Sequence, residues 1–255
     1  MNSTAIMMTA WRRPQYLRQT LASWAAVDGI QDVAAFSIAI DPSDRLEKML
    51  AVIAEARGEY GLDITARVNT RHYGVSVNPV EGGTAVFNEY PDVDYLVMAE
   101  EDLAVADDTL RYLSWANETF RDTPGVLINC AHSPDNPRLD ADPAAVVLLP
   151  RFRCWIWATW RDRWFHTLAP SWDRNYSTGT PEHPEVGFDH NINLRVIPQG
   201  GYVCALPLAS RSQNKGKFEG VHADASVYDS TLNPSFREKF GEVDYRVADA
   251  PVRAE

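Results

Sequence analysis

The sequence predicts an α/β domain in which helices flank a mostly parallel central sheet. In the first half of the 255-residue chain, short apolar runs alternate with longer stretches whose apolar residues recur at helical spacing. The apolar runs carry almost no charge, as expected for strands that are buried on both faces of a parallel sheet. Strands and helices that alternate at this spacing form a parallel sheet with helices on both faces.

Each expected strand is a short apolar run that turn-forming or charged residues end. Asp41 and Pro42 end the second run, and three carboxylates end the fourth. The expected strands are residues 5–9, 35–40, 64–68, 95–99 and 126–129.

The expected helices repeat apolar residues three or four positions apart. Leu17, Leu21 and Trp24 share one face of the first helix, and Pro14 stands where a helix begins. The third helix is weakly marked, because Gly82 and Gly83 precede its last residues. The expected helices are residues 15–26, 44–57, 84–89 and 107–120.

The regular alternation stops near residue 130, and the rest of the chain is irregular, aromatic and rich in proline. No flexible linker composition separates the two parts, so we expect one domain over residues 1–235. Its halves are residues 1–130 and 131–235, and residues 236–255 are expected to form a polar C-terminal tail.

Composition and charge exclude several classes of partner. The chain has 24 basic and 35 acidic residues and a net charge of −11, which opposes binding to nucleic acid or to anionic lipid. No apolar run approaches the about 20 residues that span a bilayer. The N-terminus lacks the features of a signal peptide, so we expect a cytoplasmic protein without a membrane partner. The three cysteines are expected to be reduced and mostly buried.

Three consecutive carboxylates, Glu100, Glu101 and Asp102, directly follow the fourth expected strand. Ligands of open α/β sheets bind beyond the carboxyl ends of the strands, where these side chains emerge. Adjacent carboxylates resist joint ionisation unless a cation offsets them, and their oxygen atoms suit Mg²⁺ or Mn²⁺. The alternative is an ordinary solvated acidic corner.

Residues 99–113 resemble the segment around the Glu-Asp-Asp motif of the GlcNAc-transferase I family, whose members have the GT-A fold, a Rossmann-like α/β fold. Five further segments resemble landmarks of the same family in the same order: the tryptophan-rich residues 157–172, then residues 187–190, 210–212, 220–222 and 228–232. The resemblance implies an inverting, metal-dependent glycosyltransferase. Such an enzyme moves a sugar from a nucleotide-sugar, here a UDP-sugar, to a hydroxyl group of a protein or glycan acceptor.

The resemblance also implies roles for particular residues. Asp102 matches the ligand of a Mn²⁺ (or Mg²⁺) ion bound to the donor diphosphate, and Glu100 and Glu101 stand beside it. Asp189 matches the catalytic base, and its alternative role is to cap a helix over residues 189–195. Trp157 is the tryptophan expected to touch the substrate, whereas most of its neighbours are expected in the core.

Further donor contacts are expected in three loops. Arg12 and Asp41 follow the first two strands, and Arg71 lies in a loop that resembles a nucleotide-sugar loop. Arg211 and His222 flank a polar, glycine-containing segment that suits a closing lid. For Arg12 the alternative is a solvated arginine, and for the lid an ordinary surface loop. Residues 1–130 would thus bind the nucleotide-sugar, and residues 131–235 the acceptor.

Two other functions remain open. A nucleotidyltransferase uses a similar sheet, but residues 9–13 lack the glycine-rich loop that such enzymes carry after the first strand. A non-catalytic sugar-binding module of the same fold would tolerate the loss of Asp102 or Asp189, and both residues are present.

Overall fold

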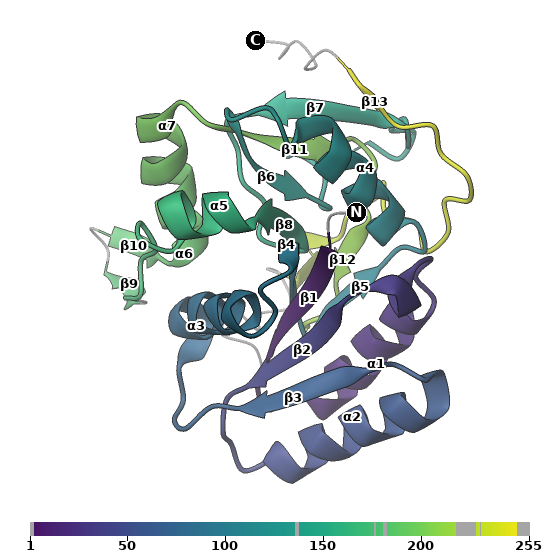
Figure 1. The fold of residues 1–255 in the computed structure, drawn as a ribbon, viewed down its shortest axis with the longest axis vertical. Coiled ribbons are helices and arrows are strands. Elements are labelled where there is room, and N and C mark those ends of the chain that lie inside the picture. Colours follow the sequence, from purple (N-terminus) through teal and green to yellow (C-terminus); the bar gives the residue numbers. More distant parts are fainter. Residues whose placement is uncertain are drawn as a thin grey trace.

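The computed structural model describes residues 3–135, 138–175, 177–180, 183–217, 228–229 and 231–248, with the backbone alone for 177–180 and 183–186. Within this part of the chain, a central sheet has the strand order β13-β7-β11-β6-β8-β4-β1-β2-β3 (Figure 1). Helices cover both of its faces. The predicted fold class, an α/β domain with a mostly parallel central sheet, is confirmed.

The N-terminal half forms the parallel part of the sheet. Its strands are β1 (Ser3–Ala10), β2 (Ala35–Ile40), β3 (Ile64–Val68) and β4 (Val93–Glu100). The register places Ala10 beside Ile40 and Thr9 beside Glu100, so β1, β2 and β4 end at the same level. The residues that follow these three strands therefore meet at one edge of the sheet.

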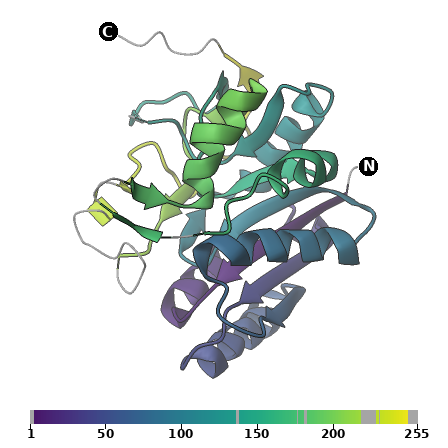
Figure 2. The same ribbon diagram turned by 90° about the vertical axis from the view of Figure 1, so that its left-hand side faces the viewer.

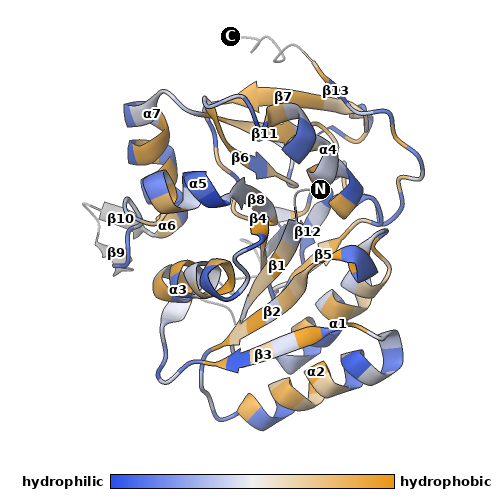
Figure 3. Ribbon diagram, viewed as in Figure 1, coloured by the Kyte–Doolittle hydropathy of each residue, from blue (hydrophilic) through white to orange (hydrophobic). Residues whose placement is uncertain are grey.

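Helices on the two faces bury opposite sides of β1. Ile6 and Met8 pack in one apolar cluster with α1 (Pro14–Ala25) and α2 (Leu46–Tyr60), and Met7 packs in the other with α3 (Gly74–Glu89). Figure 3 shows the resulting hydrophobic colour along β1 and β2. Figure 2 shows α3 lying across its face of the sheet.

Helix α3 begins ten residues earlier than the sequence indicates. Pro79, Gly82 and Gly83 would ordinarily weaken a helix, but here the glycines permit close packing. A Cβ atom added to Gly82 would lie 2.9 Å from Met7 Sδ, and one added to Gly83 would lie 2.7 Å from Trp164 Cζ2. The helix can approach the sheet and Trp164 because these side chains are absent.

The second half extends the same sheet. The added strands are β6 (Val126–Cys130), β7 (Ala145–Leu149), β8 (Trp157–Trp160) and β11 (Val203–Pro207). Strand β8 runs antiparallel to both β4 and β6 and joins the two halves. Two small sheets pair β5 (Leu103–Val105) with β12 (Ser212–Asn214) and β9 (Ser177–Thr180) with β10 (His183–Val186).

The remaining helices are mostly short. Helix α4 (Thr109–Phe120) covers the sheet beside β6. The short ones are the 3₁₀ turn Ile30–Asp32, α5 (Arg161–Arg163), the π-helical turn Trp164–Leu168, α6 (Phe188–Asn191), the π-helical turn Ile192–Val196 and α7 (Ile197–Gly200). No helix of the described residues is long and apolar enough to cross a bilayer. Cys130 and Cys204 are buried and Cys154 is half-buried, and all three are free thiols, as predicted.

Residues 236–248, which the sequence analysis assigns to a polar tail, pack against the domain. Strand β13 (Arg246–Val247) pairs with β7. Tyr245 is buried, and its hydroxyl donates a hydrogen bond to Asp108 Oδ2 at 2.8 Å. Although this stretch is mostly polar, the buried Tyr245 side chain attaches it to the domain.

Candidate functional site

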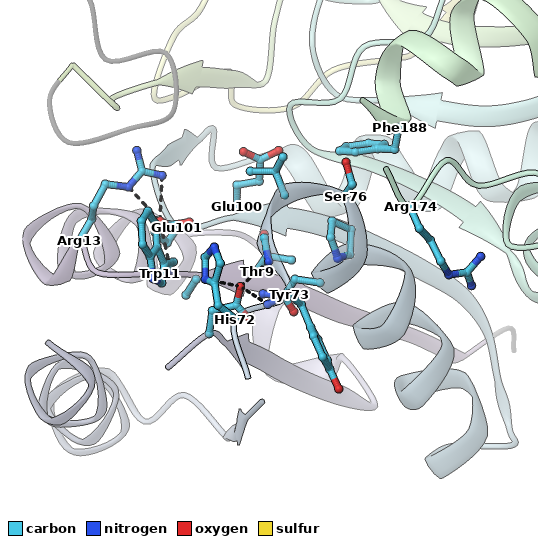
Figure 4. Close-up of a pocket in the computed structure, with 16 residues that line it drawn as sticks. Thr9, Trp11, Arg13, His72, Tyr73, Ser76, Glu100, Glu101, Arg174 and Phe188 are labelled. Atoms are coloured by element: carbon cyan, nitrogen blue, oxygen red, sulfur yellow. Dashed lines mark hydrogen bonds and ion pairs between the residues drawn. The ribbon is translucent and has the colours of Figure 1, made fainter. Parts of the chain in front are cut away.

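A pocket of about 380 Å³ lies beyond the carboxyl ends of β1, β2 and β4 (Figure 4). Three segments after these strands meet there with α3 and α6. The lining residues are Thr9, Ala10, Trp11, Arg13, Asp41, His72, Tyr73, Gly74, Val75, Ser76, Asn78, Pro79, Glu100, Glu101, Arg174 and Phe188. The pocket therefore occupies the position that the strand pattern predicts for a ligand.

The turn after β1 decides which of two adjacent arginines enters the pocket. Arg12 has a φ angle of 60°, in the left-handed region that non-glycine residues rarely adopt. Its side chain turns outward to an ion pair with Asp44 at 3.1 Å and is 42% exposed. Arg12 is therefore not among the lining residues, contrary to the prediction, and Arg13 is.

Arg13 holds two of the three carboxylates. Its Nε and Nη2 atoms donate hydrogen bonds to Glu101 Oε1 at 2.9 and 2.8 Å, and Nη1 lies 2.8 Å from Asp102 Oδ2. Burial alone would lower the pKa of Arg13, but Glu101 and Asp102 outweigh it and raise the pKa above its usual value. Arg13 is thus the cation that the acidic run requires.

Glu100 and Glu101 differ in their surroundings. Burial raises the pKa of Glu101 to about 7, although Arg13 opposes this shift. Burial and the neighbouring carboxylates of Asp102 and Glu101 raise the pKa of Glu100 to about 8. The Glu100 carboxylate lines the pocket and has no hydrogen-bond or ion-pair partner within the described part of the chain. It is the acid of this run that is available to a ligand.

Asp102, the predicted metal ligand, is covered by other residues and does not line the pocket. Its side chain is 11% exposed and is not part of the pocket wall. The backbone N–H of Lys215 donates to the Asp102 carbonyl at 2.7 Å, and a Cβ on Gly216 would lie 2.1 Å from Asp102 Oδ2. The described residues contain no group of three His, Cys, Asp or Glu side chains placed to hold a metal ion. With Arg13 on its carboxylate, Asp102 does not fit a divalent metal site.

Asp41, which is expected to contact the donor, lines the pocket, but its carboxylate already accepts hydrogen bonds from the protein. Oδ2 accepts the backbone N–H groups of Tyr73 and Gly74 at 3.0 and 2.7 Å, and His72 Nδ1 lies 3.1 Å away. Oδ1 accepts Asn69 Nδ2 at 2.8 Å. Asp41 therefore fixes the loop before α3 and satisfies that helix's first N–H groups, which have no partner inside the helix.

The loop that Asp41 fixes carries one of the aromatic walls of the pocket. His72 and Trp11 are in contact, with ring centroids 4.8 Å apart and ring planes tilted by 47°. Arg71, predicted to contact the donor, is exposed, lies over the Tyr73 ring and is not among the lining residues.

At the opposite end of the pocket, Phe188 forms the wall and stacks on Trp172 with ring centroids 4.6 Å apart. Asp189 follows it and is exposed. Gly187, not Asp189, is the N-cap residue of α6, so the alternative role of Asp189 as a cap is not realised. Burial is the main cause of the raised pKa of Glu100, and the Asp189 charge makes a smaller contribution.

Two predicted donor contacts lie in the core instead. Trp157 is buried between Trp164 and Trp172, with ring centroids 6.4 and 6.3 Å away. Arg211 is fully buried and pairs with Asp108 at 3.1 Å. Neither side chain lines the pocket. His222 lies outside the described residues.

Trp11, His72 and Phe188 belong to segments that the sequence predicts at the site, but these side chains and Arg13 are not among the predicted site residues. The acidic run after β4 indicates that a cation must lie nearby. Because β1 pairs with β4 in parallel, the arginines that follow β1 are the nearest candidates. Nothing in the sequence distinguishes Arg13 from Arg12, because the distinction depends on the left-handed turn.

No known family model matches the sequence. Among solved structures, the mannosyltransferase PcManGT from Pyrobaculum calidifontis, in complex with GDP-Man and Mn²⁺, is 16% identical, with a TM-score of 0.58 over 86% of this chain and 59% of that one. Residues 1–349 of S. aureus TarS are 8% identical, with a TM-score of 0.56 over 84% of this chain and 61% of that one. The chain thus spans about three fifths of each structure. The likeness shows a shared glycosyltransferase-type α/β fold.

Proposed function

We propose that this protein is a glycosyltransferase that moves a sugar from a nucleotide-sugar donor to a hydroxyl group of a protein or glycan acceptor. The observation that carries the proposal is the pocket beyond β1, β2 and β4, with aromatic rings at one end and, further in, the Glu100 carboxyl group, which has no hydrogen-bond partner among the described residues. The fold shared with a mannosyltransferase that was solved with GDP-Man supports it.

The aromatic end of the pocket suits a nucleobase. Trp11 and His72 offer flat faces on which a base can stack, and such stacking contributes about 1 to 3 kcal/mol per base in other proteins. The loop held by Asp41 brings the backbone of Tyr73 and Gly74 to the same wall. The resemblance to the GlcNAc-transferase I family favours UDP over other nucleotides.

The acidic end suits the sugar and the acceptor. In the proposed inverting reaction, the acceptor oxygen bonds to the anomeric carbon while the bond from that carbon to the nucleoside diphosphate breaks. Asp189, whose charge helps to raise the pKa of Glu100, takes the acceptor proton as general base. Phe188 excludes water from the reacting centre. The Mn²⁺ or Mg²⁺ ion that the resemblance implies is not part of this proposal, because Asp102 is already paired.

A thermal-shift panel tests the donor class. Wild-type protein is heated with UDP, GDP, CDP or dTDP, each in EDTA and in Mn²⁺. A nucleotide at 100 times its dissociation constant stabilises the fold by about 2.7 kcal/mol, so we expect one nucleotide to raise the melting temperature clearly. If none does under either condition, the proposal is wrong. Stabilisation by a nucleoside triphosphate alone would favour a nucleotidyltransferase.

Substitution of the proposed base separates binding from transfer. Asp189→Asn removes the proton acceptor, so we expect the rate of sugar transfer to fall by a factor of about 100 or more. Nucleotide binding should be unchanged, because Asp189 is exposed and does not line the pocket. His190→Ala, on the same helix, is the matched control for transfer assays. Full transfer by Asp189→Asn would exclude this residue as the base.

A further inference from the structure

We propose that Arg13 is the built-in cation of the donor site and stands in for the divalent metal that the family resemblance implies. The Glu101 and Asp102 carboxylates are then not vacant metal ligands but one ionic unit with Arg13. The inference rests on the proposed function only for the identity of the ligand, because the pairing of Arg13 is independent of any substrate.

The contacts of Arg13 with the carboxylates form a closely spaced, buried unit. Arg13 contacts two carboxylates through three nitrogen atoms, all at 2.8 to 2.9 Å. Glu101 Oε1 also accepts the Trp11 backbone N–H at 3.3 Å. The side chains of Arg13, Glu101 and Asp102 are 12%, 6% and 11% exposed, so water screens the unit only weakly. A metal ion at Asp102 would have to displace a buried guanidinium or tolerate its repulsion.

The backbone turn before Arg13 also supports this pairing. Arg12 adopts a left-handed conformation that costs a non-glycine residue free energy. The turn sends Arg12 outward to Asp44 and Arg13 inward to the carboxylates.

Lys215 and Gly216 cover the ionic unit. A Cβ added at Gly216 would lie 2.1 Å from Asp102 Oδ2 and 3.1 Å from Arg13 Nη1, so the backbone there rests on the contact between the two side chains. The backbone N–H of Lys215 donates to the carbonyl of Asp102. The pocket wall includes Arg13 and Glu101, but not Asp102, Lys215 or Gly216.

Arg13 retains the capacity to bind a ligand. A guanidinium has five N–H donors, and the contacts above use three of them. Since Arg13 lines the pocket, the remaining donors can meet the diphosphate of a nucleotide-sugar, whose oxygens match the planar guanidinium. The charge that a metal would supply to the leaving group then comes from this side chain.

Mn²⁺ binding, measured by electron paramagnetic resonance titration without nucleotide, tests the proposal directly. We expect wild type to bind Mn²⁺ weakly. Arg13→Ala exposes the Glu101 and Asp102 charges, so Mn²⁺ should bind at least about tenfold more tightly. Asp102→Asn in the Arg13→Ala background should abolish the gain. Arg12→Ala, which removes the adjacent exposed arginine, should behave as wild type.

Two outcomes would overturn the proposal. One is wild-type protein that binds Mn²⁺ tightly and loses that binding on Asp102→Asn. The other is a folded Arg13→Ala variant, checked by circular dichroism, that gains no Mn²⁺ affinity. If Arg13→Ala does not fold, the proposal is tested by the wild-type titration and by Arg13→Lys. The lysine keeps a cation, so this variant should bind Mn²⁺ as weakly as wild type.

The nucleotide panel provides an independent readout. We expect the stabilising nucleotide to act equally in EDTA and in Mn²⁺ on wild type. On Arg13→Ala it should act only in Mn²⁺. If no nucleotide binds, the proposed function is wrong while the Mn²⁺ titration still judges the role of Arg13. A wild-type response that requires Mn²⁺ would contradict the role of Arg13 and leave the glycosyltransferase proposal in place.

Discussion

Asp41 illustrates how a buried carboxylate can shape a pocket without being free to bind a ligand. Both of its carboxylate oxygens accept hydrogen bonds. Two of these bonds come from the backbone N–H groups of Tyr73 and Gly74 at the start of α3. Those N–H groups belong to a helix terminus and cannot find partners within the helix. The loop with His72 therefore owes its position to a residue more than 30 positions earlier in the chain.

Loss of this anchor should be costly. Asp41→Ala leaves two backbone N–H groups without their acceptor and removes one of the two acceptors of Asn69 Nδ2, so we expect the free energy of unfolding to fall by about 3 kcal/mol. Urea denaturation measures the change. The matched control is Asp44→Ala, whose exposed pair with Arg12 should contribute no more than about 1 kcal/mol. Equal effects of the two substitutions would refute the anchoring role.

At the level of elements, α3 shows why glycine can be required inside a helix. Gly83→Ala pushes a methyl group against Trp164, and overpacking of this kind costs about 1 to 3 kcal/mol. Gly58 lies in α2 with no atom near its added Cβ, so Gly58→Ala should instead stabilise the protein by about 0.5 to 1 kcal/mol. Opposite signs in thermal unfolding are the expected result, and a stabilising Gly83→Ala would contradict the observed packing.

His132 joins three segments behind the site. Its Nδ1 atom lies within 3.2 Å of oxygen atoms of Ser210 and Ser212, and Asn233 Nδ2 lies 3.3 Å from Nε2. Burial, aided by the positive charge of Arg153, lowers the pKa of His132 to about 3. The imidazole is therefore neutral in the folded protein and holds β12 beside the segments around residues 132 and 233.

This pKa predicts a pH dependence of stability. Between pH 6.5 and about 3, His132 binds a proton in the unfolded protein but not in the folded protein. The contribution of His132 to the free energy of unfolding is therefore lost as the pH falls through this range. The stability advantage of wild type over His132→Gln should therefore shrink by about 2 kcal/mol from pH 7 to pH 5. Urea denaturation at both pH values measures it. An advantage that is constant with pH would rule out the neutral, buried imidazole.

At the scale of the whole molecule, one buried ion pair ties the C-terminal residues to the core. Arg211 and Asp108 are both fully buried, Tyr245 donates to the same carboxylate oxygen, and the Arg211 guanidinium lies over the rings of Tyr112 and Phe240. This cluster connects β12 and α4 with the segment before β13. Arg211 is thus a structural residue by its position, not a donor contact.

Arg211→Met tests this assignment. It leaves Asp108 buried without its cation, so we expect the free energy of unfolding to drop by about 3 to 5 kcal/mol. Arg138→Ala, which breaks an exposed pair with Asp140, should change it by less than about 1 kcal/mol. If Arg211→Met is as stable as wild type but binds the nucleotide more weakly, Arg211 contacts the donor instead.

The sequence predicts the parallel half of this molecule well, because apolar runs bounded by turn residues determine β2 and β3 to the residue. It does not predict β8 or β12, which are short and take their conformation from distant partners. Within the site, Glu100, Glu101 and Asp41 follow from strand ends. The choice of Arg13, the contact of Trp11 with His72 and the burial of Trp157 depend on contacts across the chain, which local patterns do not contain.

The two-residue strand β13 has a consequence for how copies of the protein meet. Without it, β7 (Ala145–Leu149) would be the outermost strand of the sheet and would present unpaired backbone groups along an apolar segment. Such an edge is a template for pairing with another chain, and the short strand β13, which bears Arg246, covers it at Ala145 and Val146. Pairing with β13 thereby shortens the part of β7 that could pair with another copy of the protein.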